Sequence, residues 1–231
     1  MRICGLNKTT LLDYPGHIAA AVFLGGCNFR CPFCQNRELV LRPENQPDIN
    51  REEIFAFLRK RKGILAGVCI TGGEPTLEEE LGKFIKEIKE MGYLIKLDTN
   101  GYRPEVIKKL IEKNLLDYIA MDIKNCTERY GETTGLERIN VEKIKESTGL
   151  IMESGVDYEF RTTVVKELHK EEDILAIGRE IKGAKACFLQ GYQESEGVIA
   201  PGFHAYSRKE MERMAELIKP FVSNVQIRGI E

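Results

Sequence analysis

The sequence contains no apolar run long enough to suggest a membrane-spanning helix. The apolar stretch from His17 to Leu24 has eight residues and ends at Gly25-Gly26, whereas a membrane span needs about 18 to 20. This stretch is typical of a buried strand. The N-terminus, Met1-Arg2-Ile3-Cys4, also lacks the basic, apolar and small-residue order of a secretory signal. We therefore expect a cytoplasmic protein with no membrane partner.

The sequence also lacks a strong excess of either charge. Its 34 Lys and Arg against 36 Asp and Glu leave a formal net charge of −2, so electrostatics alone predict no nucleic-acid partner. Histidine is scarce, and His17, His169 and His204 share no spacing that would indicate a metal or catalytic site. Hydrophobic residues at 42% and charged residues at 30% argue against disorder and coiled coils. A chain of 231 residues is then expected to fold as one domain, 1–231.

Short β-branched runs alternate with amphipathic charged stretches, as in repeated βα units. This pattern predicts an α/β fold: a partial (β/α)6 barrel with a parallel sheet and outer helices. The predicted strands are His17–Leu24, Leu65–Thr71, Tyr93–Asp98, Tyr118–Ile123, Asp157–Val165, Lys185–Gln190 and Val222–Ile227.

Helix signals lie between several of these strands. A helix is predicted over Leu77–Met91, and another over Ser207–Lys219 that Pro220 closes. Pro104 suits a first helical position, and Asn50 resembles the start of a capping box. Residues 42–48 and 126–140 are expected to be loops.

Three cysteines follow the first predicted strand, within the run Gly25-Gly26-Cys27-Asn28-Phe29-Arg30-Cys31-Pro32-Phe33-Cys34. A structural zinc site uses four protein ligands, and no fourth Cys or His follows at a suitable spacing. A four-iron cluster fits better, because three thiolates leave one iron open to bind a further ligand. The remaining cysteines stand singly and are expected in the core.

This motif resembles that of the radical S-adenosylmethionine (SAM) superfamily. The segments Leu12-Asp13-Tyr14-Pro15-Gly16 and Gly25 to Asn36 are similar to the opening of anaerobic ribonucleoside-triphosphate reductase activating proteins. Those proteins are in turn similar to pyruvate formate-lyase activating enzyme.

The resemblance implies a [4Fe-4S] cluster held by Cys27, Cys31 and Cys34, with SAM on the open iron. One electron, from a flavodoxin or ferredoxin, would cleave SAM to methionine and a 5'-deoxyadenosyl radical. That radical would abstract a hydrogen from a glycine of a partner enzyme, with anaerobic ribonucleotide reductase as the expected partner.

The resemblance also implies SAM-binding residues at the strand ends. Gly72-Gly73-Glu74 matches the Gly-Gly-Glu motif of the superfamily, in which the carboxylate pairs with the SAM ammonium. Asp98, Asp122 and Lys124 match positions that contact SAM and hold a monovalent cation in the pyruvate formate-lyase activator. The alternatives are an Asx-turn for Asp98 and a salt bridge between Asp122 and Lys124.

Two further residues carry weaker signals. Arg161 interrupts an apolar strand and faces either SAM or a carboxylate partner in a structural ion pair. Gln190 ends the sixth βα strand, where the pyruvate formate-lyase activator has a histidine and this chain has none. Its amide is suited to the adenine or ribose of SAM.

The sequence was weighed against three functions. The first is the activase described above, acting on anaerobic ribonucleotide reductase or on a different glycyl radical enzyme. The second is a radical SAM enzyme with a small-molecule substrate, such as a 7-carboxy-7-deazaguanine synthase. The third, an iron-sulfur electron carrier, does not account for Gly72-Gly73-Glu74 or for the repeated βα units.

Overall fold

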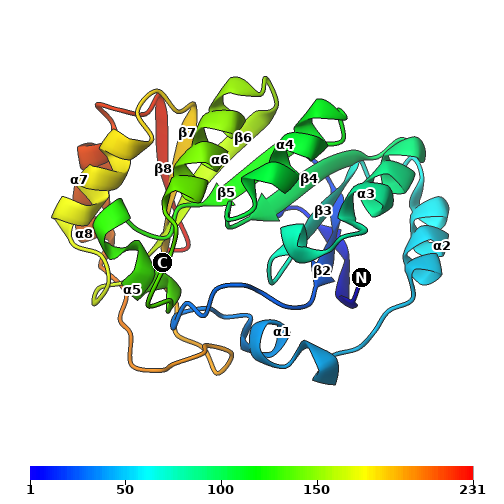
Figure 1. Cartoon of the computed structure of the whole chain (residues 1–231), viewed down its shortest axis with the longest axis horizontal. Helices are drawn as coiled ribbons and strands as arrows, with labels where there is room; N and C mark the ends of the chain where they lie inside the picture. Colours follow the sequence, from blue (N-terminus) through cyan, green and yellow to red (C-terminus); the bar gives the residue numbers. More distant parts are fainter. Residues whose placement is uncertain (231) are drawn as a thin grey trace. The chain divides into compact units, whose positions relative to one another are not determined.

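A computed structural model describes residues 1–230, in which strands alternate with helices (Figure 1). The strands are β1 (Ile3–Thr10), β2 (Ala19–Leu24), β3 (Gly67–Gly72), β4 (Leu94–Thr99), β5 (Tyr118–Asp122), β6 (Asp157–Val164), β7 (Ala186–Gly191) and β8 (Asn224–Arg228). The α-helices are α1 (Arg37–Leu41), α2 (Arg51–Arg61), α3 (Leu81–Glu90), α4 (Pro104–Glu112), α5 (Tyr130–Thr134), α6 (Glu142–Glu153), α7 (Glu171–Glu180) and α8 (Arg208–Ile218). Single 3-10 turns form η1 (Pro43–Asn45), η2 (Pro75–Leu77) and η3 (Thr127–Arg129).

The strands form one sheet in which they follow chain order from β1 to β8. β1 is antiparallel to β2, and the pairs β2–β3, β3–β4, β6–β7 and β7–β8 are parallel. Parallel neighbours need a crossover connection, and helices supply it here. The predicted α/β class, with a parallel sheet and helical connections, is confirmed, as are all seven predicted strands to within two residues.

Strand β1 was not predicted from the sequence. Its second half, Asn7-Lys8-Thr9, is exposed, and the strand lies at the end of the sheet order. An edge strand with a solvated face has no continuous apolar run. It forms because its backbone pairs with β2, from Ile3 opposite Leu24 to Thr10 opposite Ala19.

Two predicted element boundaries were wrong. The helix expected from Leu77 begins instead at Leu81, because Pro75–Leu77 forms the separate turn η2. The loop expected over 126–140 contains η3 and the short helix α5. Burial of Tyr130 and hydrogen bonds from the Thr133 and Thr134 hydroxyls to carbonyls one turn earlier support α5 despite its weak helix propensity.

Other local predictions are confirmed. Pro104 is the first residue of α4, and Ser207 caps α8 in a reciprocal capping box with Glu210. At Asn50 the side chain accepts a hydrogen bond from Glu52 N–H, without the reciprocal bond of a capping box. Residues 42–48 are irregular apart from η1.

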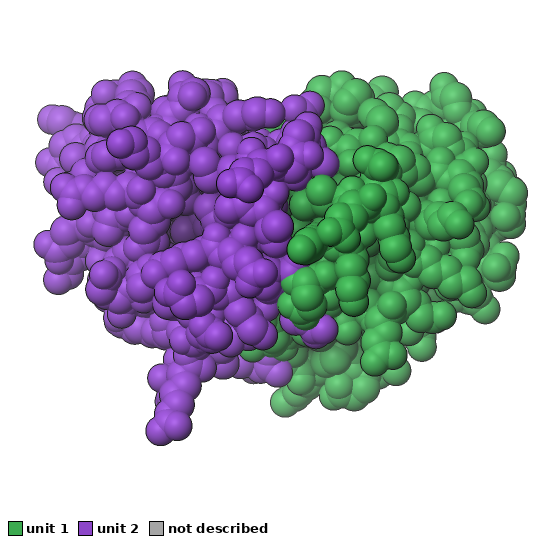
Figure 2. All heavy atoms as spheres, turned by 45° about the horizontal axis from the view of Figure 1, so that its top comes forward, with its two compact units in different colours: residues 1–28, 38–99, 105–119 green, residues 29–37, 100–104, 120–231 purple. Residues whose placement is uncertain are grey.

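The chain forms two compact units, coloured green and purple in Figure 2. Unit 1 comprises residues 1–28, 38–99 and 105–119, and unit 2 comprises residues 29–37, 100–104 and 120–231. In unit 1 the buried α3 side chains Leu81, Phe84, Ile85 and Ile88 form the apolar face that the sequence predicted, and Phe84 packs against Phe55 of α2. In unit 2, α7 and α8 pack side by side beside β7 and β8 (Figure 1).

None of the helices within residues 1–230 combines the length and apolar composition that a bilayer crossing requires.

Candidate functional site

The predicted site residues fall in both units and are described unit by unit. Unit 1 contains Cys27, Gly72, Gly73, Glu74 and Asp98, and unit 2 contains Cys31, Cys34, Asp122, Lys124, Arg161 and Gln190. The seven cysteines of the chain all lie within residues 1–230, and no disulfide joins any two of them.

In unit 1, the end of β3 lies directly against the backbone that precedes Cys27. Gly73 N–H donates to Leu24 O at 2.9 Å, and Glu74 N–H donates to Gly26 O at 2.8 Å. A Cβ on Gly72 would lie 2.2 Å from Leu24 O, and one on Gly73 would lie 1.9 Å from Gly26 O. The two glycines are therefore required for contact between two backbone segments, and Gly72 also has a φ of +124°.

Glu74 is buried and partnered by threonines. Its Oε1 accepts hydrogen bonds from Thr76 N–H at 3.1 Å and from Thr99 Oγ1 at 2.7 Å, and also from the Thr76 hydroxyl. These bonds tie the turn after β3 to the end of β4. The Gly-Gly-Glu segment thus supports the loop that carries Cys27.

Asp98, at the end of β4, forms an ion pair with Lys96 on the same strand. The Lys96 side chain is 2% exposed, and its Nζ lies 3.9 Å from Cys69 Sγ on the neighbouring β3. Lys96 was missed from the sequence, although a lysine two residues before an aspartate in an apolar strand places both on one face.

In unit 2, the segment that connects β7 to α8 runs along the cysteine loop. Ala200 N–H donates to Pro32 O at 2.8 Å, Ile199 N–H donates to Cys34 O at 3.1 Å, and Arg37 N–H donates to Gly197 O at 3.2 Å. Within the loop, Cys34 N–H donates to Cys31 O at 3.0 Å. These bonds hold Cys31 and Cys34 on a tight turn, Cys31 buried and Cys34 half-buried.

Asp122, Lys124 and Arg161 form one ion network. Asp122 accepts from Arg161 Nε at 2.9 Å through Oδ1 and from Lys124 Nζ at 3.0 Å through Oδ2. Burial alone would raise the pKa of Asp122, but the two cations outweigh burial and lower it to about 2. Asp122 is thus a carboxylate at neutral pH. Arg161 has the carboxylate partner that its place in an apolar strand required.

The Lys124 ammonium also interacts with the thiols of Cys31 and Cys34. Burial would lower the pKa of Lys124, but the charges of Asp122, Cys31 and Cys34 raise it overall. The Lys124 ammonium is therefore charged at neutral pH, within electrostatic range of two of the three motif cysteines. A cation there would stabilise thiolates, the form in which cysteines bind iron.

Gln190 does not join this network. It lies on β7 opposite Thr163 of β6 and Arg228 of β8, and it is half-buried. An ion pair that the sequence did not reveal joins β8 to β6. Arg228 of β8 binds buried Glu159 of β6 through both terminal guanidinium nitrogens, at 3.0 and 3.1 Å. Nothing in either residue's local sequence indicated the partner.

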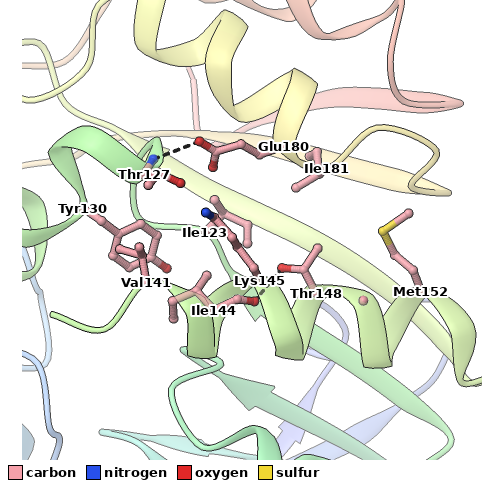
Figure 3. A pocket seen from close by; sticks show the side chains of 11 residues that line it. Ile123, Thr127, Tyr130, Val141, Ile144, Lys145, Thr148, Met152, Glu180 and Ile181 are labelled. Carbon is pink, nitrogen blue, oxygen red and sulfur yellow. Dashed lines mark hydrogen bonds between the residues drawn. The ribbon is translucent and has the colours of Figure 1, made fainter.

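A cavity of about 300 Å³ lies elsewhere in unit 2, among α5, α6 and the end of α7 (Figure 3). Its lining is mostly apolar, including Val141, Ile144 and Met152, and Glu180 closes one side by accepting from Thr127 N–H at 2.9 Å. None of the predicted site residues lines it.

The donor set fits an iron-sulfur cluster. Cys31 and Cys34 are thiols that interact with the charge of Lys124, and Cys27 is a half-buried thiol that follows the backbone contact of Gly26. Within residues 1–230, no three His, Cys, Asp or Glu side chains gather around a point suited to one metal ion. A [4Fe-4S] cluster takes each thiolate on a different iron.

Sequence comparisons identify the relatives of this chain. Residues 21–179 match the radical SAM superfamily. A Methanocaldococcus jannaschii protein that carries the name of a glycyl-radical enzyme activating enzyme is 32% identical over 99% of this chain and 96% of its own length. A 7-carboxy-7-deazaguanine synthase of Thermococcus kodakarensis is 29% identical over 73% of this chain and 72% of its own length.

Solved structures share the fold at low sequence identity. Streptococcus suis SuiB bound to S-adenosylmethionine superposes with a TM-score of 0.69 at 15% identity, covering 89% of this chain and 51% of SuiB. The chain thus spans about half the length of that protein. The peptide-bound enzyme anSMEcpe with AdoMet has a TM-score of 0.63 at 16% identity, over 87% of this chain and 58% of its own. Fold and sequence agree: the chain belongs to the radical SAM superfamily, whose enzymes use a [4Fe-4S] cluster and S-adenosylmethionine.

Proposed function

We propose that this protein is a glycyl-radical enzyme activating enzyme whose partner is an anaerobic ribonucleotide reductase. The observation that carries the activase assignment is the 32% identity over nearly the full length of both chains to the M. jannaschii protein of that name. The reductase as partner rests on the similarity of Leu12 to Gly16 and Gly25 to Asn36 to reductase activators.

In this proposal Cys27, Cys31 and Cys34 hold the cluster. When bound, a reduced cluster would supply one electron to SAM, and the C5'–S bond of SAM would break. Methionine would then leave, and a hydrogen atom would move from a glycine Cα to the 5'-deoxyadenosyl carbon. Lys124 provides positive charge beside two of the thiolates. Asp122 binds the ammonium, Arg161 binds the Asp122 carboxylate, and both residues are proposed to contact SAM.

Glu74 is proposed to act near the amino group of SAM. Its partners, Thr76 and Thr99, are hydroxyl and amide donors that hold the carboxylate in one orientation. The monovalent cation expected beside Asp98 and Asp122 has less support, because each carboxylate already has a protein cation: Lys96 for Asp98, and Lys124 with Arg161 for Asp122. Gln190 remains a proposed adenine or ribose contact.

An electron donor of the flavodoxin or ferredoxin class and a cytoplasmic location complete the proposal. The match to 7-carboxy-7-deazaguanine synthase supports a second candidate function, that of a radical SAM enzyme that acts on a purine precursor. Both candidates use the same cluster and cofactor, so they differ only in the source of the transferred hydrogen.

The deciding experiment follows that hydrogen. Anaerobically reconstituted protein is incubated with reductant, SAM and either the reductase or a peptide copy of its glycine loop, deuterated at the glycine Cα. We expect deuterium in 5'-deoxyadenosine and a glycyl radical signal by electron paramagnetic resonance. Deuterium transfer from a labelled purine precursor, with none from any glycine loop, would replace the activase by the small-molecule enzyme.

A further inference from the structure

His169, for which the sequence predicted no function, contacts the backbone of Lys124. It is fully buried in the turn between β6 and α7. Its Nε2 lies 2.8 Å from Lys124 O, and its Nδ1 accepts a hydrogen bond from Val165 N–H at 3.1 Å. One imidazole ring thus joins the end of β6 to the segment that follows β5.

The partners of the ring determine its tautomer. A carbonyl oxygen only accepts, so the proton must reside on Nε2 and be donated to Lys124 O. Nδ1 lies 3.1 Å from Val165 N and 3.3 Å from Val165 O, and the shorter contact, with a backbone N–H that only donates, favours an unprotonated Nδ1. Burial lowers the pKa of His169, which agrees with this neutral ring.

Lys124 depends on side chains for its backbone hydrogen bonds, because it lies beyond the last residue of β5. Its carbonyl accepts from His169, and its N–H donates to Tyr130 Oη at 3.3 Å. The next residue, Asn125, is anchored to the same turn, since its Nδ2 donates to Leu168 O at 2.9 Å. The turn at residues 168–169 therefore sets where the Lys124 side chain starts.

We propose that His169 is a positioning residue, which holds the Lys124 backbone so that the ammonium lies between Asp122 and the thiols of Cys31 and Cys34. The inference rests on the proposed function, in which those cysteines bind the cluster. It adds a residue 45 positions from Lys124 in sequence that controls the charge beside the cluster. A buried histidine that served stability alone would not change the position of the Lys124 charge relative to the cluster.

The test compares the midpoint potential of the cluster among variants of the full-length, anaerobically reconstituted protein. H169N lacks a donor at the Nε2 position, whereas H169Q can place its amide N–H there. K124M removes the ammonium itself. Y158F is the control, because it removes a partly buried hydrogen bond at the other end of β6, from Lys185 N–H to the Tyr158 hydroxyl at 3.0 Å.

We expect H169N to shift the midpoint potential to more negative values, in the same direction as K124M. The reason is that the Lys124 ammonium is no longer fixed beside the thiolates, so its positive charge stabilises the reduced cluster less. H169Q should remain close to the wild type, and Y158F should lower thermal stability without moving the potential. SAM affinity of H169N should fall about threefold to tenfold, the effect of one weakened polar contact. Adding H169N to K124M should shift the potential no further.

A wild-type potential in folded H169N, or additive shifts in the double variant, would overturn the inference. If H169N does not fold, Y130F, which releases the Lys124 N–H, takes its place, and a wild-type potential in that variant overturns the inference as well. Failure of the wild-type protein to bind a cluster would instead contradict the proposed function.

Discussion

At the residue scale, Cys27 and Cys34 have partly exposed side chains, and Cys31 lies between them on the same loop. The Lys124 ammonium interacts with Cys31 and Cys34, but fully buried Cys69 on β3 also has an ammonium nearby, with Lys96 Nζ at 3.9 Å from its Sγ. A thiol is a ligand only where its thiolate is stabilised and accessible. Because a nearby cation is common to both kinds of cysteine, it is accessibility that favours the loop cysteines as the proposed ligands.

We expect C27A, C31A and C34A each to lose the cluster after anaerobic reconstitution, because each removes one of three iron ligands. C69A should keep about four irons and four sulfides per chain. Iron and sulfide analysis with the visible absorption spectrum measures both outcomes. A normal cluster in C31A, or stoichiometric zinc in an active wild-type protein, would contradict the assignment.

The Asp122 network predicts a pH dependence of stability. The pKa of Asp122 is lowered to about 2 in the folded protein, so its contribution is complete above the pKa of the unfolded chain, near 4. It is lost as the pH falls through about 4 to 2. We expect cluster-free D122N to be about 2 kcal/mol less stable than wild type at pH 7, because Lys124 and Arg161 lose their carboxylate.

The difference between D122N and wild type should then shrink below pH 4, as Asp122 of the wild type becomes protonated. Urea unfolding of both proteins at a series of pH values measures this difference. A gap that stays constant down to pH 2 would show that Asp122 does not titrate in this window.

At the element scale, the contact between the end of β3 and the end of β2 depends on glycine. We expect G73A to destabilise the protein by about 2–4 kcal/mol and to reduce iron incorporation, because its Cβ would meet Gly26 O at 1.9 Å. G82A is the matched control on α3, where a Cβ has only an ordinary contact with Leu110 at 3.7 Å. Its stability should stay within about 1 kcal/mol of wild type.

Urea unfolding and iron analysis measure both glycine variants. The packing argument for Gly73 fails if G73A matches G82A in stability and in iron content. Iron loss with unchanged stability would indicate a role for Gly73 in ligand approach rather than in backbone packing.

At the scale of the whole molecule, the strands from β2 to β8 and their connections occupy residues 19–228. A reactive radical needs an enclosed site from which water is excluded. If the enclosure comes from the partner, a glycine loop laid across the strand ends would supply both the cover and the hydrogen donor. The free-energy cost of ordering that glycine loop would be offset by the binding free energy of the interface with the partner.

We therefore expect the reduced enzyme to cleave SAM slowly by itself and faster with the partner or its glycine-loop peptide. Chromatographic measurement of 5'-deoxyadenosine over time gives the rate, and a scrambled peptide is the control. Equal rates with and without the partner would show that the protein closes its own site.

The sequence by itself determined those features that depend on neighbours along the chain. The spacing of Cys27, Cys31 and Cys34, the Gly72-Gly73-Glu74 turn and seven strands could all be predicted, because turns and periodic burial are local properties. The superfamily followed from the same motifs. The antiparallel edge strand β1 and the short helix α5 could not, since neither has a strong local pattern.

Only the tertiary structure decided which charges meet. Arg161 binds Asp122 across 39 residues of sequence and His169 binds Lys124 across 45, because parallel strands bring their ends to one edge in a register that local patterns do not encode. Lys96 was missed from the sequence, and its pairing with Asp98 became clear only in the structure. Local chemistry specified the cysteine motif, and strand register specified the charges that surround it.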